Sequence, residues 1–282
     1  MKILIVGGTS SLAQVLKPVL SQFAEVSTAG RAGCDMRLDL SGTDGAICLP
    51  KGFEVVINVA AQFGGNDFDR VLAAENVNVL GALKLCHACT QAEVGHLVQV
   101  SSIFAGLGKG SPFYGIYSVS KRHAEEVVQL YGGRFKLPLT ILRPAQIYGV
   151  GESFRKHQPF LYSIIDKAQR NEEIVFFGSN DARRNFIHAE DVANIIARVV
   201  QKRTEGIFSC QNSVNITYSE IARAAIAAFD SASTIRFLRG KPDVADNAFD
   251  PDEGLFRRIK YFPRISFALG MKKEADFRRS LQ

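Results

Sequence analysis

The stretch from residue 2 to residue 13 constrains the fold of this chain more than any other. Residues 2–6 form an apolar run, as expected for a parallel strand buried on both faces. Gly7 and Gly8 follow at once and lead into a helical pattern that runs through Leu20. A glycine turn between strand and helix brings backbone N–H groups and the positive helix end to a phosphate. Of the three glycines of the usual dinucleotide fingerprint, the second and third are replaced here by Ser10 and Ala13.

Strand and helix patterns continue to alternate beyond this turn. With 282 residues, this rhythm predicts an α/β fold with a Rossmann-type doubly wound parallel sheet and a smaller C-terminal lobe. We expect a dinucleotide-binding domain over 1–150, to which 181–205 return, and a substrate-binding lobe over 151–180 and 206–282. The expected strands are 25–28, 53–61, 97–100 and 207–213, and the expected helices are 71–92, one beginning at Tyr117, one within 151–171, and 218–229.

Composition excludes several classes of protein. Hydrophobic residues make up 46% and charged residues 22%, as in ordinary globular proteins, and no apolar run approaches the ~18 residues of a membrane span. The N-terminus lacks the pattern of a signal peptide, and the five cysteines suggest no disulfide framework, so we expect a cytoplasmic protein. The net charge of +6 is spread along the chain, which gives no reason to expect nucleic acid. Cys86 and Cys89 are expected to be packing residues, and no metal site is predicted.

The stretch from Val100 to Lys121 carries the chemistry. Tyr117 and Lys121 are four residues apart in a helical pattern and therefore share one helix face. A phenol has an unperturbed pKa near ~10, and a nearby ammonium lowers this pKa, so the tyrosine could exchange protons near neutral pH. A serine at the end of the preceding strand could hold the reacting oxygen. By itself such a pair also occurs by chance as an exposed pair, so its context must decide.

The end of the second expected strand indicates the cofactor. No acidic residue stands near Arg31 to bind a ribose 2′-hydroxyl, whereas Arg31 itself could bind a 2′-phosphate. This favours NADP(H) and leaves NAD(H) possible; the alternative is a solvated arginine. Asp39 and Leu40 are placed to cap the adenine end. Small residues after the strand at 53–61, such as Ala60 and Ala61, would allow a cofactor to lie close to the backbone.

Together these segments resemble the extended short-chain dehydrogenase/reductase family, especially its nucleotide-sugar epimerases, dehydratases and 4-ketoreductases. The resemblance covers nearly the whole chain. Its motifs are GGTSSLA at 7–13, DL at 39–40, NVLG at 78–81, VSS at 100–102, YSVSK at 117–121, LRPAQIYG at 142–149 and RNFIHAEDVA at 184–193.

The resemblance implies a role for each matching residue. Tyr117 would be the acid/base, Lys121 would bind the nicotinamide ribose and lower the tyrosine pKa, and Ser102, with Ser101 as a rival, would hydrogen-bond the reacting oxygen. Arg184 would clamp the substrate diphosphate, the alternative being a surface ion pair. Gln146 stands where an asparagine often contacts substrate, and His188 is expected to be structural. The implied cofactor contacts are Gly7, Thr9, Ser10, Ser11, Leu12, Arg31, Asp39, Leu40, Ala60, Ala61, Asn78, Val100, Tyr117, Lys121, Pro144 and Ile147.

The resemblance also covers the C-terminal region. It implies a closing strand–loop–helix over 256–280, and the run DVADNAFDPDEG at 243–254 is expected to be a mobile flap or a plain surface loop. A homodimer would form through the helix near 72–91 and the helix that starts at Tyr117.

The residues after Ser102 narrow the reaction. Ile103 and Phe104 stand where the 4,6-dehydratases of this family carry an Asp-Glu pair, which argues against water elimination. Epimerases keep NAD bound, whereas reductases consume NADPH, which agrees with Arg31. The sequence thus predicts an NADP-dependent reductase of a nucleotide-activated 4-keto-6-deoxy sugar. The alternatives are an NAD-dependent nucleotide-sugar 4-epimerase and a non-catalytic NADP-binding regulatory protein.

Overall fold

The computed structural model describes residues 1–42 and 47–281 and contains a seven-stranded parallel sheet. The strand order is β11-β6-β5-β4-β1-β2-β3, so the order changes direction between β1 and β4. This is the doubly wound arrangement that the sequence predicted, and that prediction is confirmed. The strands are β1 (Lys2–Val6), β2 (Glu25–Gly30), β3 (Met36–Arg37), β4 (Val55–Asn58), β5 (Leu97–Val100), β6 (Leu139–Pro144) and β11 (Gly206–Cys210).

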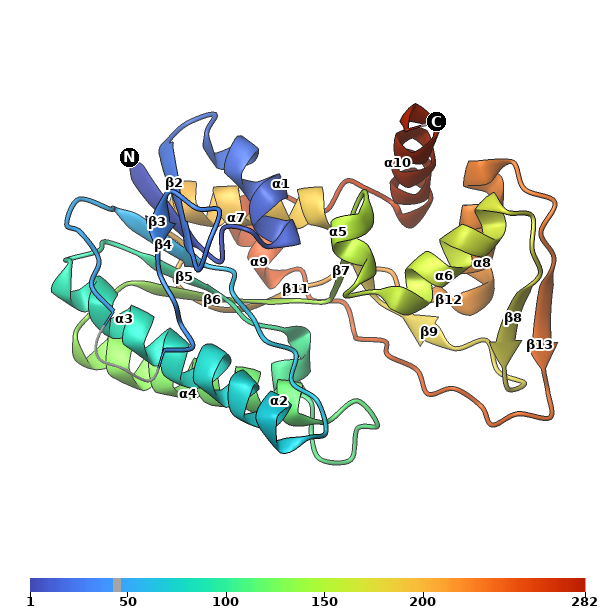
Figure 1. Ribbon diagram of the computed structural model, residues 1–282, viewed down its shortest axis with the longest axis horizontal. Coiled ribbons are helices and arrows are strands. Elements are labelled where there is room, and N and C mark those ends of the chain that lie inside the picture. The colour runs from blue at the N-terminus through green and yellow to red at the C-terminus, as the bar shows by residue number, and fades with distance from the viewer. Residues whose placement is uncertain (43–46, 282) are drawn as a thin grey trace. The chain divides into compact units, whose positions relative to one another are not determined.

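Helices cover both faces of this sheet. Figure 1 shows α3 (Gly81–Gln91) and α4 (Ile116–Arg134) along one face, with α1 (Ser11–Leu20) and α7 (Ala189–Lys202) on the other. Such cover on both sides explains why the central strands are buried at every position rather than at every second one. Ile3, Leu4, Ile5 and the four residues of β4 are at most 1% exposed.

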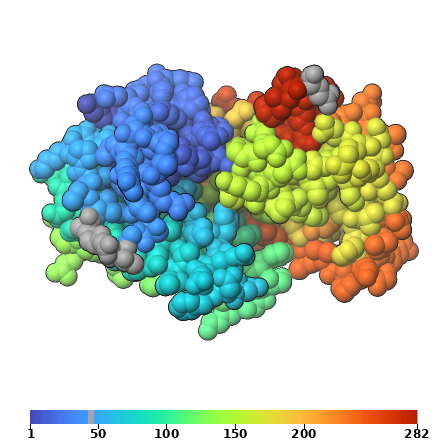
Figure 2. All heavy atoms as spheres, viewed as in Figure 1, coloured from blue at the N-terminus to red at the C-terminus, as the bar shows by residue number. Residues whose placement is uncertain are grey.

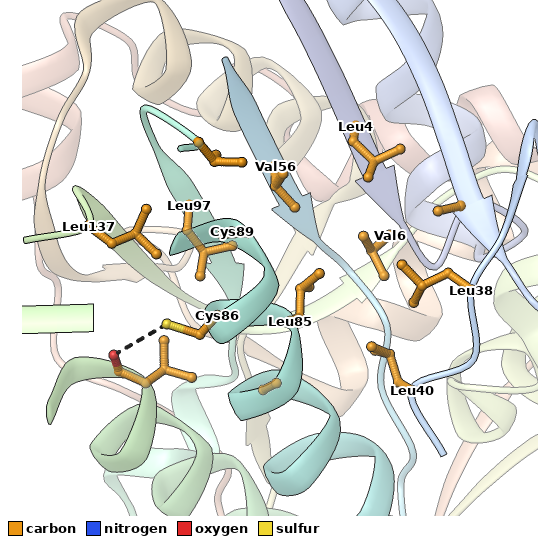
Figure 3. Packing of buried hydrophobic residues seen from close by; sticks show 14 of the residues in the cluster. Leu4, Val6, Leu38, Leu40, Val56, Leu85, Cys86, Cys89, Leu97 and Leu137 are labelled. Carbon is orange, nitrogen blue, oxygen red and sulfur yellow. Dashed lines mark hydrogen bonds between the residues drawn. The ribbon is translucent and has the colours of Figure 1, made fainter. Parts of the chain in front are cut away.

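A hydrophobic cluster lies between the sheet and the helices α3 and α4 (Figure 3). Cys86 and Cys89 of α3 are fully buried in it, beside Leu85 and Leu97. Burial raises the pKa of the Cys86 thiol to about 11 and that of Cys89 further, because a thiolate would lose its hydration there. Both side chains are therefore neutral packing groups in this core.

The helix expected over 71–92 begins earlier and is interrupted. It consists of α2 (Phe68–Ala74), a π-helical turn η1 (Glu75–Leu80) and α3. A Cβ at Gly81 would lie 2.8 Å from the Cβ of Leu40, so glycine permits the close approach of α3 to the segment after β3. Periodicity alone cannot reveal a π-turn, because the apolar spacing is kept on both sides of it.

The chain divides into two compact units. Unit 1 comprises residues 1–144, 193–210 and 254–261, and unit 2 comprises 145–192, 211–253 and 262–282. Residues 206–210 belong to unit 1 because β11 pairs with β6, and α9 (Gly254–Ile259) packs on β11. The separate roles expected for a cofactor domain and a substrate lobe stay predictions.

Unit 2 contains short paired strands and helices. The pairs are β7 with β10, β9 with β12 and β8 with β13. Its elements are β7 (Gln146–Tyr148), α5 (Glu152–Arg155), α6 (Pro159–Gln169), β8 (Ile174–Phe177), β9 (Arg183–Arg184), β10 (Phe186–His188), β12 (Ile216–Thr217), α8 (Tyr218–Phe229), β13 (Ile235–Leu238) and α10 (Phe267–Ser280).

Several expected element bounds were wrong. The expected strand 53–61 ends at Asn58, where the side chain of Asn58 accepts a hydrogen bond from the Ala60 N–H and turns the chain. The expected strand 207–213 is β11 and ends at Cys210. The C-terminal segment begins with helix α9 rather than a strand, because Leu255, Phe256 and Ile259 follow helical spacing and are all buried.

The segment at 243–254 has little regular structure but is hydrogen-bonded to the rest of unit 2. The Asp243 carboxylate accepts from the backbone N–H groups of Ser179 and Asn180, and Asp246 pairs with Arg183. Among the described residues, no helix is both long and apolar enough to cross a membrane.

Candidate active site

The carboxyl ends of the parallel strands meet at the point where the strand order changes direction. At this point Gly7 follows the last residue of β1, and β4 leads into Ala60. Gly7 has φ +87°, and a Cβ there would lie 2.8 Å from the backbone nitrogen of Ala60. In open α/β sheets, ligands bind in the crevice outside the strand ends at such a switch point. Glycine at position 7 therefore allows the turn after β1 to pass close to the segment after β4, at the edge where such a ligand would bind.

The turn after β1 leads directly into the N-terminus of α1. Ser10, which replaces the second glycine of the fingerprint, is the N-cap of this helix, and its Oγ accepts from the backbone N–H of Ala13 at 3.2 Å. Ala13, in the third glycine place, is buried against the sheet. The substitutions thus keep the strand–turn–helix geometry, and the first-turn N–H groups of α1 can receive a pyrophosphate. The residues present fit a dinucleotide.

The end of β2 presents a cation. Arg31 follows Gly30 and is exposed. The nearest following acid, Asp35, accepts hydrogen bonds from the backbone N–H and hydroxyl of Thr28, at 2.8 and 2.9 Å, and pairs with Lys17. Its carboxylate is therefore already engaged by its own unit. A guanidinium beside this strand end is suited to a phosphate.

Asp39 and Leu40 follow β3. The Asp39 carboxylate accepts from the Ser41 N–H and hydroxyl, and these bonds lower the pKa of Asp39, with a smaller contribution from Arg31. Leu40 is buried against Gly81.

Tyr117, Lys121 and Ser102 lie together at the end of β5. The Ser102 hydroxyl lies beside the phenol of half-buried Tyr117 and acts to lower its pKa. Lys121 is 2% exposed; its Nζ donates to the Val100 carbonyl at 3.1 Å and lies 5.9 Å from the centroid of the Tyr117 ring. The helical spacing therefore does place the tyrosine and lysine on one face, next to a serine from the sheet.

The titration of this pair differs from the expectation. Burial raises the pKa of Tyr117 to about 12, and the hydrogen bond from Ser102 opposes the rise only in part. Burial lowers the pKa of Lys121 to about 8, and the nearby Glu125 carboxylate opposes this fall. An ammonium attracts a phenolate, as the sequence prediction assumed, but the desolvation of both groups dominates here and disfavours their charged forms.

Ser101 has a different set of partners from Ser102. Its hydroxyl donates to Oε1 of Glu125, a carboxylate that is only 1% exposed. Arg143 of β6 binds the same carboxylate through Nε, at 3.0 and 3.1 Å, and through Nη2 at 2.5 Å. The two candidate hydroxyls are thus separated by their contacts: Ser102 contacts Tyr117, and Ser101 contacts Glu125.

Phe63 contacts Tyr117 directly, and Asn78 connects the segment that carries Phe63 to the helix that carries Tyr117. The ring of Phe63 stacks on Tyr117, with centroids 4.9 Å apart and an interplanar angle of 21°. Asn78 holds the preceding residue, since it donates to the Gln62 carbonyl at 2.7 Å and accepts from the Gln62 N–H at 2.8 Å. Asn78 also donates to the hydroxyl of Ser120 in α4. The loop after β4 is thereby tied to the helix that carries Tyr117.

Unit 2 holds the residues predicted to contact substrate. Arg184 is 7% exposed; its guanidinium stacks on Tyr218 and donates to the carbonyls of Arg183 and Ala245. The exposed ion pair at this place is made by the neighbouring Arg183 with Asp246. Burial on one face of β9 distinguishes the two arginines, because successive side chains point in opposite directions.

Gln146 and His188 lie on paired strands of unit 2. The Gln146 side chain accepts from Asn247 at 3.2 Å and donates to Gln158 at 3.3 Å, and the Asn247 backbone bridges to Arg184. His188 is 2% exposed, ends β10 and packs edge-on against Tyr148. This placement is that of a residue packed in a strand-to-helix junction.

Most of the predicted cofactor contacts therefore lie at the carboxyl edge of the sheet in unit 1, while Gln146, Ile147 and Arg184 belong to unit 2. Sequence reasoning missed Glu125, Arg143, Phe63 and Asn247. Glu125 could have been found, since it follows Lys121 at the same four-residue spacing. The partners of Phe63 and Asn247 depend on tertiary contacts. Within residues 1–42 and 47–281, no group of three or more acidic, histidine or cysteine side chains could hold a metal ion.

Fold and site together define an NAD(P)-dependent enzyme of the short-chain dehydrogenase/reductase type. The profile of the NAD dependent epimerase/dehydratase family matches residues 3–216. The chain belongs to this family, in the nucleotide-sugar branch of the extended short-chain dehydrogenases/reductases, as its motifs predicted.

Relatives within the family have different reactions in their names. A dTDP-D-glucose 4,6-dehydratase of Mus musculus is 25% identical over 244 residues, covering 80% of this chain and 68% of the relative. A putative UDP-glucose 4-epimerase of Methanocaldococcus jannaschii is 25% identical over 245 residues, covering 82% and 76%. A dTDP-4-dehydro-6-deoxy-D-allose reductase of Streptomyces bikiniensis is 25% identical over 127 residues, covering 45% and 39%.

The fold is shared with solved structures. The crystal structure of the UDP-glucose 4-epimerase of Thermus thermophilus, in complex with NAD, superposes with a TM-score of 0.76 at 20% identity and covers all of both chains.

Proposed function

We propose that this protein is an NADP-dependent reductase of a nucleotide-activated 4-keto-6-deoxy sugar. The observation that carries the proposal is the grouping of Ser102, Tyr117 and Lys121 at the carboxyl edge of the sheet, followed by the apolar residues Ile103 and Phe104. A hydroxyl, a phenol and an ammonium can orient a carbonyl and deliver one proton to it. A dehydratase would need acidic side chains where these two apolar residues stand.

The proton chemistry follows from these contacts. When bound, NADPH supplies the hydride that reduces the keto carbon and is itself oxidised to NADP⁺. Ser102 donates a hydrogen bond to the keto oxygen and keeps it beside the phenol of Tyr117. The phenol O–H bond breaks as the proton passes to the new alkoxide, and the ammonium of Lys121 stabilises the phenolate that remains. A proton from solvent then restores Tyr117.

The preference for NADP rests on charge at the end of β2. Arg31 is exposed there, and the following Asp35 is engaged by Thr28 and Lys17. A ribose 2′-phosphate would meet a cation that can bind it, whereas a 2′-hydroxyl would lack the usual carboxylate partner. A consumable NADPH suits a reductase, and a relative named as a dTDP-4-dehydro-6-deoxy-D-allose reductase is consistent with that reaction.

The second candidate is an NAD-dependent nucleotide-sugar 4-epimerase. The relative from M. jannaschii and the NAD complex from T. thermophilus are both named as UDP-glucose 4-epimerases, and the same three side chains could serve that reaction. An epimerase returns the hydride to its substrate and therefore holds NAD tightly. A non-catalytic NADP-binding regulator would bind cofactor without turnover.

Substrate binding is proposed to involve unit 2. Arg184, beside Tyr218, would clamp the nucleotide diphosphate, and Gln146 would contact the sugar. The clamp requires Arg184 to give up bonds that its guanidinium donates, among them those to the carbonyls of Arg183 and Ala245 and to the Tyr218 hydroxyl, for phosphate oxygens. Bonds between a guanidinium and phosphate are charge-assisted and stronger than those to neutral carbonyls, which favours the exchange.

A cytoplasmic homodimer is proposed as the working form. Apolar side chains are exposed on α2, η1 and α4, and the surface of unit 1 near residues 68–80, drawn in cyan, faces the viewer in Figure 2. Exposed apolar side chains on neighbouring helices are typical of an interface between copies. They are Phe68, Leu72, Leu80 and Leu130, which are 45–77% exposed.

The first test is a titration of the purified protein with NADPH and with NADH, after a check for copurified nucleotide. Tighter binding of NADPH supports the reductase, and tightly held NAD would make the epimerase the leading candidate. Turnover of nucleotide-linked 4-keto-6-deoxy sugars is then measured for the natural protein and for Tyr117→Phe. Loss of turnover with NADPH binding retained supports the enzyme; unchanged turnover would refute the role of Tyr117.

A further inference from the structure

A buried carboxylate lies one helical turn beyond Lys121. Tyr117, Lys121 and Glu125 are spaced at four-residue intervals on α4 and therefore follow one another along one face of the helix. Lys121 and Glu125 are 2% and 1% exposed. Charges are rarely buried to this extent without partners, because each ion loses its hydration and needs other groups to replace it. Glu125 and Lys121 therefore need charged or hydrogen-bonding partners inside the protein.

Strands β5 and β6 supply these partners. Arg143 of β6 binds both carboxylate oxygens of Glu125, and Ser101 donates to one of them. The residue before Ser101 is Val100, whose carbonyl accepts from Lys121. The Ser101 N–H in turn donates to the Leu142 carbonyl at 2.7 Å. The ends of β5 and β6 thus hold Lys121 and the Glu125 carboxylate in fixed positions, one and two helical turns after Tyr117 on α4.

We propose that Glu125, held by Arg143 and Ser101, is a positioning residue that keeps Lys121 protonated and so sets the pH range in which Tyr117 can deliver its proton. The inference rests on the proposed roles of Tyr117 and Lys121. The carboxylate does not touch the reacting atoms. The negative charge of Glu125 acts on the buried ammonium of Lys121 through space. The hydrogen bonds from the Arg143 guanidinium hold the Glu125 carboxylate in its orientation.

The charged and titratable groups around Lys121 support this assignment. On α4 these are Tyr117 and Glu125, and from β6 the guanidinium of Arg143 faces Glu125. The end of β5 contributes the Val100 carbonyl and the hydroxyls of Ser101 and Ser102, and η1 contributes neutral Asn78 through Ser120. His123 of α4 pairs separately with Glu75 and is more than half exposed. Among the groups that the structure describes, Glu125 is the anion that acts on Lys121, and the positive charge of Arg143, paired with Glu125, offsets part of that effect.

Two substitutions should therefore shift the titration of Lys121 in opposite directions. Glu125→Gln removes the anion and leaves Arg143, so the apparent pKa of Lys121 should fall. Arg143→Gln removes the cation and leaves Glu125, so this pKa should rise. Two unit charges roughly 6 Å apart at an effective dielectric constant near 20 correspond to a shift of about one to two pH units. Arg143→Lys keeps the charge and should leave the pKa within about half a unit.

The experiment measures the NMR signal of the Lys121 side chain against pH in protein with isotope-labelled lysine. The signal is assigned by its absence from Lys121→Arg. Circular dichroism confirms that each variant is folded. Opposite shifts for Glu125→Gln and Arg143→Gln, with little change for Arg143→Lys, support the proposal. No shift, or shifts in the same direction, would overturn it, because a purely structural ion pair would not reverse the sign.

The same variants are then assayed for ketone reduction. The alkaline limb of kcat/KM should move with the pKa of Lys121, downward for Glu125→Gln and upward for Arg143→Gln. A limb that stays in place while the NMR titration moves would overturn the functional part of the proposal. If Glu125→Gln does not fold, the proposal is tested by the other two variants: the pKa of Lys121 should rise in Arg143→Gln and stay nearly unchanged in Arg143→Lys. The NMR titration needs no substrate, so it remains a test even if the proposed reductase activity is not found.

Discussion

Single replacements of the neighbouring residues Ser101 and Ser102 should affect different properties of the protein, stability for Ser101 and kcat for Ser102. Ser102→Ala removes the hydroxyl that contacts Tyr117, whereas Ser101→Ala removes a bond to Glu125 and leaves the phenol untouched. We expect Ser102→Ala to lower kcat by about 10²–10³-fold, the loss that follows removal of one donor to a developing oxyanion, or about 2.7–4 kcal/mol. Ser102→Thr keeps a hydroxyl and should retain most of the activity.

The expected effect of Ser101→Ala is on stability. Glu125 retains three contacts with Arg143, at 2.5–3.1 Å, after the serine hydroxyl is lost. The missing hydrogen bond to a buried charged group should cost about 1.5–3 kcal/mol of the free energy of unfolding. Because the carboxylate stays paired and in place, kcat should fall less than about tenfold, which corresponds to about 1.4 kcal/mol.

The assay follows NADPH oxidation at saturating sugar nucleotide, and urea unfolding gives the free energy of each variant. Ser102→Ala should also lose the bond that Ser102 Oγ accepts from the Phe104 N–H, worth about 1 kcal/mol, so its stability change should be the smaller one. A larger loss of kcat in Ser101→Ala than in Ser102→Ala would refute this reasoning and make Ser101 the hydroxyl that holds the reacting oxygen.

Three further predictions concern binding and the loop after β4. Arg31→Ala should weaken NADPH about 10–100-fold, the value of a charge-assisted bond, and leave NADH unchanged in fluorescence titrations; equal losses would contradict a 2′-phosphate contact. Arg184→Ala should raise the Kd of the sugar nucleotide by a similar factor by calorimetry without weakening NADPH, and parallel losses for both ligands would exclude the diphosphate role. Asn78→Ala should lower the free energy of unfolding by about 1–3 kcal/mol in urea, because Gln62 loses two bonds, while Ser120→Ala, which removes one partner, should cost less.

Much of the fold could be predicted because its signals are local. The apolar run of β1, the glycine turn and the helical pattern of α1 adjoin one another, and the bounds of β1 and α8 agree with the prediction. The i,i+4 rule likewise placed Tyr117 and Lys121 on one face of α4. The π-turn η1 and the helix α9 were missed. The local periodicity of these segments is compatible with more than one structure, and tertiary packing selects the one that forms.

The choice between the two serines could not be made from sequence. Ser101 and Ser102 are adjacent and chemically identical, and their side chains differ only in what the neighbouring elements bring to them: Arg143 and Glu125 to one, Tyr117 to the other. These partners come from β6 and α4, up to 42 positions away in the chain.

The sequence by itself thus determined the family, the doubly wound sheet and the candidate residues, because strand period, glycine turns and motif spacing are properties of short segments. Only the tertiary structure decided how those residues are charged and paired. It half-buried Tyr117 and fully buried Lys121, and so moved their pKa values against the simple expectation for the pair. It also placed the Glu125–Arg143 ion pair one helical turn beyond Lys121. Desolvation and charge–charge distances depend on every element packed around a group, and these distances exist only once the chain has folded.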